Sequence, residues 1–200
     1  MLEKTNYHQE YVQPEKLVKI QSFPIETQQI LEKEGFLIYP FSGQSIKSLR
    51  EAGEKFLTTW HKNYPDFEAL TSRLSQVAIN PQNLFLPDSN KKTLLRQEEM
   101  VVAFSQEISR KIKGVRAIIG EAPDYIELAF IHLKETGEYL FGKKYNYGYA
   151  RTKTLINDSE VVNVGRFSHK FGLQIIRLRP NHRFKFVWAV PILVPDPGSY

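Results

Sequence analysis

The chain has 200 residues, of which 27 are basic and 22 acidic, and its formal net charge is +5 with an isoelectric point near 9.2. A chain of this length buries enough surface to fold as a domain without disulfides. Cysteine is absent, which excludes thiol catalysis and any zinc or iron–sulfur site with cysteine ligands.

Residues 1–24 form a polar segment that is rich in Gln, Glu, Lys and Tyr and contains Pro14 and Pro24. This composition predicts an N-terminal arm, and it lacks the basic, apolar and small-residue regions of a signal peptide. No later segment reaches the roughly 18 consecutive apolar residues that a membrane span needs. We therefore expect a soluble cytoplasmic protein without a membrane partner, in which residues 25–200 form a single domain.

Two helices with a strand between them are predicted after the arm. Residues 25–35 suit a short helix that ends with glycine, and residues 36–39 form a continuous apolar run that is typical of a strand. Apolar residues then recur at helical spacing behind a capping serine, either Ser42 or Ser45. This pattern predicts a long helix over residues 45–61.

A hairpin and a second long helix follow. The short apolar runs 76–79 and 84–86 are separated by a turn-like sequence, which indicates a hairpin. Residues 93–113 carry a single apolar stripe that ends before Gly114, and this stripe predicts the second principal helix. Residues 115–119 then predict a strand.

Residues 125–133 are compatible with a helix or with a strand. As a helix, the segment has a capping box formed by Asp124 and Glu127. As a strand, it pairs with residues 138–141 across a turn at Gly137. Its β-branched and aromatic content favours the hairpin, which is the interpretation that we adopt.

The end of the chain indicates an antiparallel meander of residues 161–167, 173–178 and 184–193. Together these elements predict an α+β fold. Its sheet is mostly antiparallel, includes the C-terminal three-stranded meander, and packs against the two principal helices at 45–61 and 93–113.

The most suggestive functional segment is residues 139–154, where tyrosines alternate with basic residues around two glycines. Rings that stack on bases, combined with cations that contact phosphates, are the usual means of holding single-stranded nucleic acid. The same alternation also fits one face of a strand that packs on the core. We predict binding of single-stranded nucleic acid or another polyanion, with the basic residues of 177–185 as an extension if the meander lies beside the segment. The candidate binding residues are Lys143, Lys144, Tyr145, Tyr147, Tyr149, Arg151 and Lys153.

An enzyme with an acid/base site is the alternative. The densest acidic set is Glu121, Asp124 and Glu127, followed by His132, and in a helix two of these acids lie one turn apart. With a distant ligand, such a pair could hold a divalent cation, whereas helix capping explains the same residues without chemistry.

No cofactor is predicted, and no histidine metal site. The five histidines lack paired spacing, and the phosphate-loop, GxGxxG and GxSxG patterns are all absent. A third hypothesis is a protein–protein interaction module that docks through the N-terminal arm or through a C-terminal tail. That tail contains Pro191, Pro195 and Pro197, which we expect to end the sheet.

Overall fold

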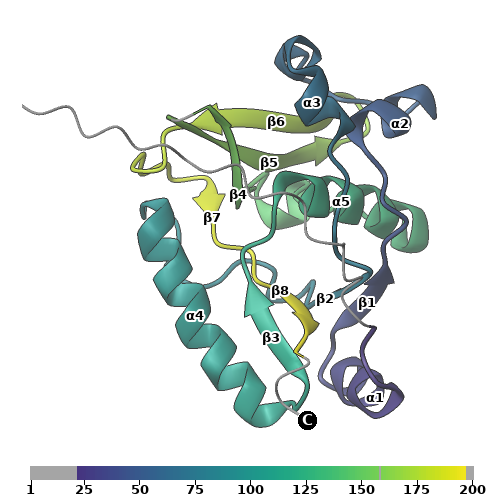
Figure 1. Cartoon of the computed structure of the whole chain (residues 1–200), viewed down its shortest axis with the longest axis vertical. Coiled ribbons are helices and arrows are strands. Elements are labelled where there is room, and N and C mark those ends of the chain that lie inside the picture. The colour runs from purple at the N-terminus through teal and green to yellow at the C-terminus, as the bar shows by residue number, and fades with distance from the viewer. Residues whose placement is uncertain (1–21, 158, 197–200) are drawn as a thin grey trace, which may run out of the picture.

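Two four-stranded sheets enclose a central helix in the computed structural model of the protein, which describes residues 22–157 and 159–196 (Figure 1). The first sheet has the strand order β1 (Leu37–Pro40), β2 (Gln76–Ile79), β8 (Ile192–Pro195) and β3 (Val115–Ile118), with every pair antiparallel. The second sheet has the order β6 (Gly172–Leu178), β5 (Glu160–Ser168), β4 (Tyr149–Asn157) and β7 (Val187–Trp188). The helices are α1 (Ile25–Lys33), α2 (Ile46–Glu51), α3 (Pro65–Ala69), α4 (Leu94–Lys111) and α5 (Ala122–Thr136), with 3₁₀ turns η1 (Trp60–Asn63) and η2 (Lys143–Tyr145).

The predicted α+β class and the mostly antiparallel pairing are confirmed. A three-stranded antiparallel meander is present, but it consists of β4, β5 and β6. Residues 184–193, predicted as its third strand, form instead the short β7, which pairs in parallel with β4, and the start of β8 in the other sheet. Pro191 interrupts this segment because proline has no backbone N–H to donate.

The first sheet separates two hydrophobic cores, because neighbouring residues of a strand point to opposite faces. In β2, Val77 and Ile79 face the core around α5, whereas Ala78 faces the core that contains residues of α4 and α1. In β8, Ile192 and Leu193 divide in the same way. The sheet is thus covered on both sides along β2 and β8, whereas Arg116 of the edge strand β3 is exposed.

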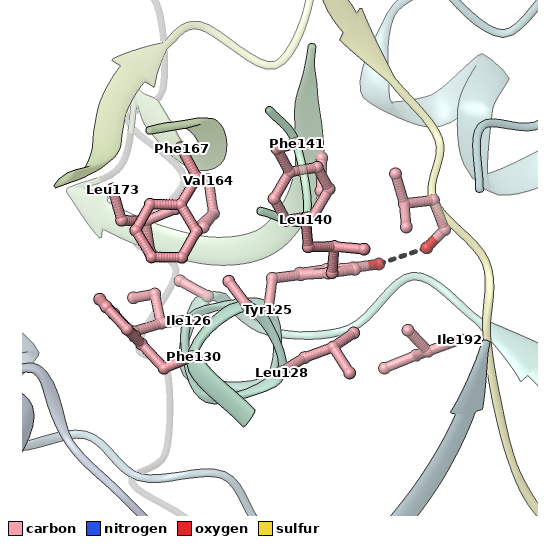
Figure 2. Packing of buried hydrophobic residues seen from close by; sticks show 14 of the residues in the cluster. Tyr125, Ile126, Leu128, Phe130, Leu140, Phe141, Val164, Phe167, Leu173 and Ile192 are labelled. Atoms are coloured by element: carbon pink, nitrogen blue, oxygen red, sulfur yellow. Dashed lines mark hydrogen bonds between the residues drawn. The ribbon is translucent and has the colours of Figure 1, made fainter. Parts of the chain in front are cut away.

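The segment predicted as a hairpin, residues 125–133, is helical and belongs to α5. Ten of the helix residues are buried, on all sides of its axis, as the side chains in Figure 2 show. The Tyr125 hydroxyl donates to the Val190 carbonyl at 2.6 Å and accepts from the Gly120 amide at 3.0 Å. Residues 122–130 are buried without a break, so the aromatic and β-branched residues of this helix reflect burial and not strand formation. Residues 138–141, the proposed partner strand, are irregular.

Helix α4 confirms the prediction for residues 93–113. The Thr93 side chain accepts from the Arg96 amide at 3.3 Å, and Gly114 follows the helix with a φ of +76°. Its apolar stripe packs against β3. Within the described residues, no helix combines the length and the apolar character needed to cross a membrane.

The helix predicted over residues 45–61 ends after one and a half turns, at Glu51. Residues 55–58 instead cover the open edge of β6: the Leu57 amide donates to the Leu173 carbonyl, and the Leu173 amide donates to the Lys55 carbonyl, both at 2.9 Å. An exposed strand edge needs such a partner, and an extended segment supplies it where a helix cannot. Likewise, residues 84–86 form no strand, because β2 pairs with β1 and β8.

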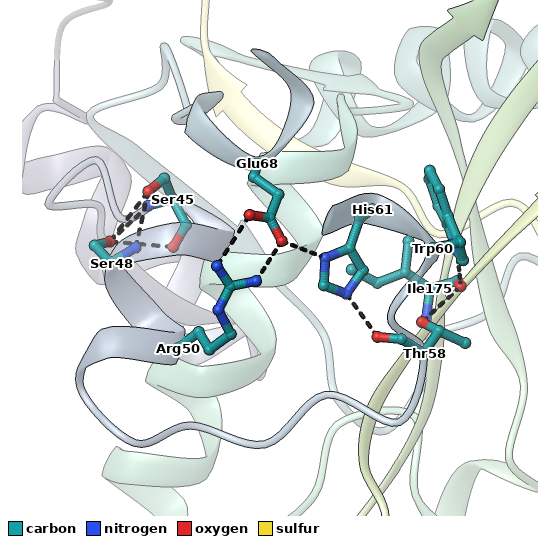
Figure 3. Close-up of polar contacts among 8 residues, drawn as sticks. All are labelled: Ser45, Ser48, Arg50, Thr58, Trp60, His61, Glu68 and Ile175. Carbon is teal, nitrogen blue, oxygen red and sulfur yellow. Dashed lines mark hydrogen bonds and ion pairs between the residues drawn. The ribbon is translucent and has the colours of Figure 1, made fainter. Parts of the chain in front are cut away.

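A buried ion-pair network fixes the segment that follows α2 (Figure 3). The Glu68 carboxylate accepts hydrogen bonds from both terminal nitrogens of Arg50, and it lies 2.7 Å from His61 Nδ1. The other ring nitrogen, His61 Nε2, lies 2.7 Å from the Thr58 carbonyl oxygen. Burial raises the pKa of Glu68, but the hydrogen bonds from Arg50 and His61 outweigh burial and hold this pKa below its ordinary value. The network therefore joins α2, η1 and α3.

Most of the predicted N-terminal arm, residues 1–21, lies outside the described residues. Phe23 at its end is buried in the core with α1 and α4, and its amide donates to Gln76 at 2.8 Å. Of the proline-containing tail, Pro195 is buried in β8 between β2 and β3, and Pro197 lies outside the described residues.

The turn into β6 requires a glycine. Gly172 has a φ of +78°, and a Cβ built there would lie 2.2 Å from the Lys55 carbonyl oxygen. We expect Gly172→Ala to destabilise the protein by about 3 kcal/mol or more, since it combines left-handed strain with a backbone collision. Gly137→Ala is the control, because Gly137 has a φ of +75° and free space around it, so it should cost only about 1–2 kcal/mol. Urea denaturation measures both, and equal losses would contradict this explanation.

Candidate functional site

The predicted tyrosine-rich segment does not form one continuous surface. Three of the candidate residues are exposed on or just after the η2 turn: Lys143, Lys144 and Tyr147. The exposed fraction of Tyr147 is 40%. Lys144 pairs with Glu138 at 2.7 Å. Lys153 is exposed at a different place, where its Nζ lies 3.8 Å from Glu98 of α4.

The other three candidates of this segment are buried. Tyr145 is 7% exposed and Tyr149 is 5% exposed, with the Tyr149 hydroxyl hydrogen-bonded to Gln174. Arg151 is fully buried. For Tyr149 and Arg151 the reason is that β4 is an inner strand between β5 and β7 and that this end of the strand is buried. Tyr145 belongs instead to the η2 turn, so of the alternating tyrosines only Tyr149 lies in a strand.

Arg151 carries a buried charge, and no carboxylate of the described residues pairs with it. Its guanidinium donates to Gln97 Oε1 at 2.9 Å and to the carbonyls of His182 at 2.9 Å and Lys92 at 3.3 Å. Nη1 is buried and has no hydrogen-bond partner. Burial lowers the pKa of Arg151 to about 10, so the group is still charged at neutral pH.

Through these contacts Arg151 lies beneath the loop that joins β6 to β7, which crosses the N-terminal end of α4 (Figure 1). Three further hydrogen bonds hold this loop to the start of the helix. They run from the Lys91 amide to the Phe184 carbonyl, from the Leu94 amide to the Pro180 carbonyl, and from Asn90 Nδ2 to the Lys185 carbonyl. Of the predicted extension, residues 180–185 therefore lie beside Arg151, whereas Arg177 lies on β6 over the Trp60 ring and pairs with Glu160.

The two segments bring together a set of cations that we call the basic surface: Lys91, Lys92, Arg179, Arg183 and Lys185. All are at least partly exposed, and none forms an ion pair with a described carboxylate. The N-terminal end of α4 adds the positive end of a helix dipole. Two ion pairs lie close to these residues in sequence: Arg177 with Glu160, and Arg96 with Glu99. The second is more than half exposed and contributes little.

Aromatic side chains border the basic surface. Lys185 Nζ lies 4.7 Å from the centre of the Phe186 ring, and the Phe186 and Phe184 rings meet edge to face at 5.7 Å. Both rings are partly exposed. Sequence reasoning identified the basic residues of the loop but missed Lys91 and Lys92, whose signal is their position immediately before a capped helix.

The predicted acidic candidates separate into two places. Glu121 and Asp124 lie together at the start of α5, where the Glu121 amide donates to Asp124 Oδ2 at 2.7 Å and Ser72 donates to Oδ1 at 2.6 Å. The capping pair is thus Glu121 with Asp124 and not Asp124 with Glu127. Desolvation raises the pKa of Asp124 to about 6, although the hydrogen bonds from Ser72 and Glu121 oppose this shift.

Glu127 and His132 do not join that pair. The Glu127 carboxylate accepts from the amides of Ser42, Gly43 and Gln44 at 2.6, 3.0 and 3.1 Å, which makes it an anchor for the loop before α2. His132 Nδ1 lies 2.6 Å from the Tyr39 hydroxyl, and burial lowers the pKa of His132. Across residues 22–157 and 159–196, no three His, Asp or Glu side chains are placed to hold a metal ion.

The chain matches no known protein-family model, and no curated protein or solved structure is similar enough to it to count as a match.

The anchoring role of Glu127 predicts a stability effect. Glu127→Gln replaces one acceptor oxygen by a donor, so at least one charge-assisted hydrogen bond to the loop amides is lost. We expect a loss of about 2 kcal/mol in the free energy of unfolding, measured with urea. The control is Glu135→Gln, which changes an exposed residue on the same helix and should leave stability within about 0.5 kcal/mol. Equal stability of the two variants would contradict the anchoring role.

The pKa of Asp124 predicts a pH effect. Since its folded value of about 6 lies above the ordinary value of 3.8, the folded protein keeps a proton that the unfolded chain releases between these values. The contribution of this group to stability therefore falls as the pH rises from about 4 to 6, by on the order of 3 kcal/mol in total. Asp124→Asn removes this change, so the stability of the variant relative to the unsubstituted protein should increase from about pH 4 to about pH 7. A constant difference between these pH values would refute the shift.

Proposed function

We propose that the protein binds a polyanion at the basic surface, and that the polyanion is single-stranded nucleic acid. The observation that carries the proposal is the gathering of five unpaired cations from two distant segments, held against each other by backbone hydrogen bonds above the buried Arg151. Cations without carboxylate partners leave a field that attracts phosphate groups.

The buried Arg151 supports the same conclusion. Within the described part of the chain no carboxylate neutralises its charge, so it adds to the field of the basic surface from below. A carboxylate at this depth would cancel that field, and the amide oxygen of Gln97 occupies the place instead. The desolvation penalty of the buried Arg151 charge thus falls at a place where a ligand phosphate would offset it.

The bordering rings favour a single strand over a duplex. Phe184 and Phe186 are partly exposed beside the cations, and Tyr147 is exposed on the neighbouring loop before β4. Unpaired bases stack on such rings, whereas the bases of a duplex are already stacked within the helix. The lack of cysteine is also compatible with the cytoplasmic location that we predict, where such ligands occur.

The test is fluorescence anisotropy of labelled single-stranded and duplex oligonucleotides over a series of salt concentrations. We expect tighter binding of the single strand and a linear fall of log K with log salt concentration. The triple variant Arg179→Ala, Arg183→Ala, Lys185→Ala should weaken binding and lower the magnitude of that slope by about 2, at about 0.7 for each lost phosphate contact.

A matched control removes the same charge elsewhere. Lys33→Ala, Lys47→Ala, Lys134→Ala changes three exposed lysines of α1, α2 and α5, and it should leave the affinity and the salt slope close to those of the unsubstituted protein. If both triple variants lost the same amount of affinity, the loss would reflect the net charge of the protein and not the basic surface. Absence of binding at low salt would reject the proposal, and tighter binding of duplex would reject the role of the rings.

A further inference from the structure

A separate hollow of about 500 Å³ lies between β3, β4 and the N-terminal end of α5. Its volume falls within the usual range for sites that bind small molecules. A second hollow of about 430 Å³ adjoins it on the side of α4, and the two share Arg116, Ile118, Ile119 and Lys153. The result is a groove along β3, which is an edge strand of the first sheet.

Three cations from three different segments line the larger hollow. Arg73 precedes β2, Arg116 is on β3 and Lys153 is on β4, and all three are exposed. Only Lys153 has a carboxylate within 4 Å among the described residues, at the 3.8 Å limit of an ion pair. Two guanidinium groups in one hollow suit the bidentate binding of a carboxylate.

Apolar side chains line the same hollow. Leu70 and Leu155 are 43% and 58% exposed, while Leu74 and Ile119 in the same lining are buried. A ligand that covers exposed leucines and contacts arginines must combine an apolar body with an anionic group.

The carboxyl of Asp124 also lines the hollow. It is 4% exposed, and it faces Glu121 from its own helix and Arg73, Arg116 and Lys153 from the other walls. Glu127, the next acid along the helix, repels its charged form. In its protonated form the Asp124 carboxyl no longer repels an anion, so an anionic ligand and a proton should bind together.

We propose that this hollow binds small organic carboxylates, with the ligand carboxylate on Arg73 and Arg116 and its apolar body on Leu70 and Leu155. The site is distinct from the basic surface and does not depend on nucleic-acid binding. Its ligand is a small amphipathic acid and not a polyanion.

The test is titration of the isotope-labelled full-length protein with 3-phenylpropionate and with octanoate, followed by amide chemical shifts. We expect saturable shifts at residues 116–124 and 153–155, tighter binding near pH 6, where the acids are still ionised, than near pH 8, and little binding of the uncharged 3-phenylpropionamide. Arg116→Met should weaken binding of the acids at least tenfold. Arg110→Met, an exposed change on α4 outside both hollows, should leave it unchanged.

Each other outcome overturns the proposal. No saturable shift with either acid would show that the hollow is not a carboxylate site. Shifts at residues 179–185 would assign the acids to the basic surface, and equal binding of the amide would remove the anionic requirement. A loss of binding in Arg116→Met is interpreted only where its amide spectrum shows the folded protein; Arg73→Met provides a second variant at the same site.

Discussion

The burial of α5 on all sides is the constraint on which the rest of the structure depends. The helix fills the space between the two sheets, so each sheet needs a face that is apolar and complementary to it. Its one deeply placed hydroxyl, on Tyr125, ties the turn at Gly120 to the chain at Val190. Because Val190 lies between β7 and β8, this single side chain connects the two sheets at their junction. Removing an apolar side chain from such a helix leaves a cavity that neighbouring elements cannot fill.

Arg151 is a second buried side chain that connects separate elements, in this case close to the surface. It is held by the side chain of Gln97 and by two carbonyls, so it fixes the distance between β4, α4 and the loop before β7. A hydrophobic residue of similar volume would pack there without a desolvation cost.

The sequence permits prediction where local signals and tertiary context agree. Helix α4 has a capping threonine, one apolar stripe and a terminal glycine, and its location is predicted to within two residues. Residues 52–61 could not be assigned correctly from spacing, because their conformation is set by the edge of β6, more than 100 residues away. Helix α5 was misread because burial on all sides removes the amphipathic period that distinguishes a helix from a strand.

The candidate site shows the same division. Alternating tyrosines and basic residues in 143–153 indicated both a binding segment and a strand face, and only the pairing of β4 with β5 and β7 shows that Tyr149 and Arg151 point inward. The prediction that residues 177–185 extend the basic surface depended on the position of the meander. The hydrogen bond from Arg151 to the His182 carbonyl shows that this loop lies next to β4.

The position of β8 has a consequence for biosynthesis. This strand is the last in the described chain, yet it lies inside the first sheet, between β2 and β3. A nascent chain therefore emerges from the ribosome with β2 and β3 separated and with both hydrophobic cores open, until residues 192–195 arrive. Pairing across such sequence separations is slow and leaves apolar surface exposed meanwhile. Neither hydrophobic core can therefore close before residues 192–195 have been synthesised and have inserted between β2 and β3.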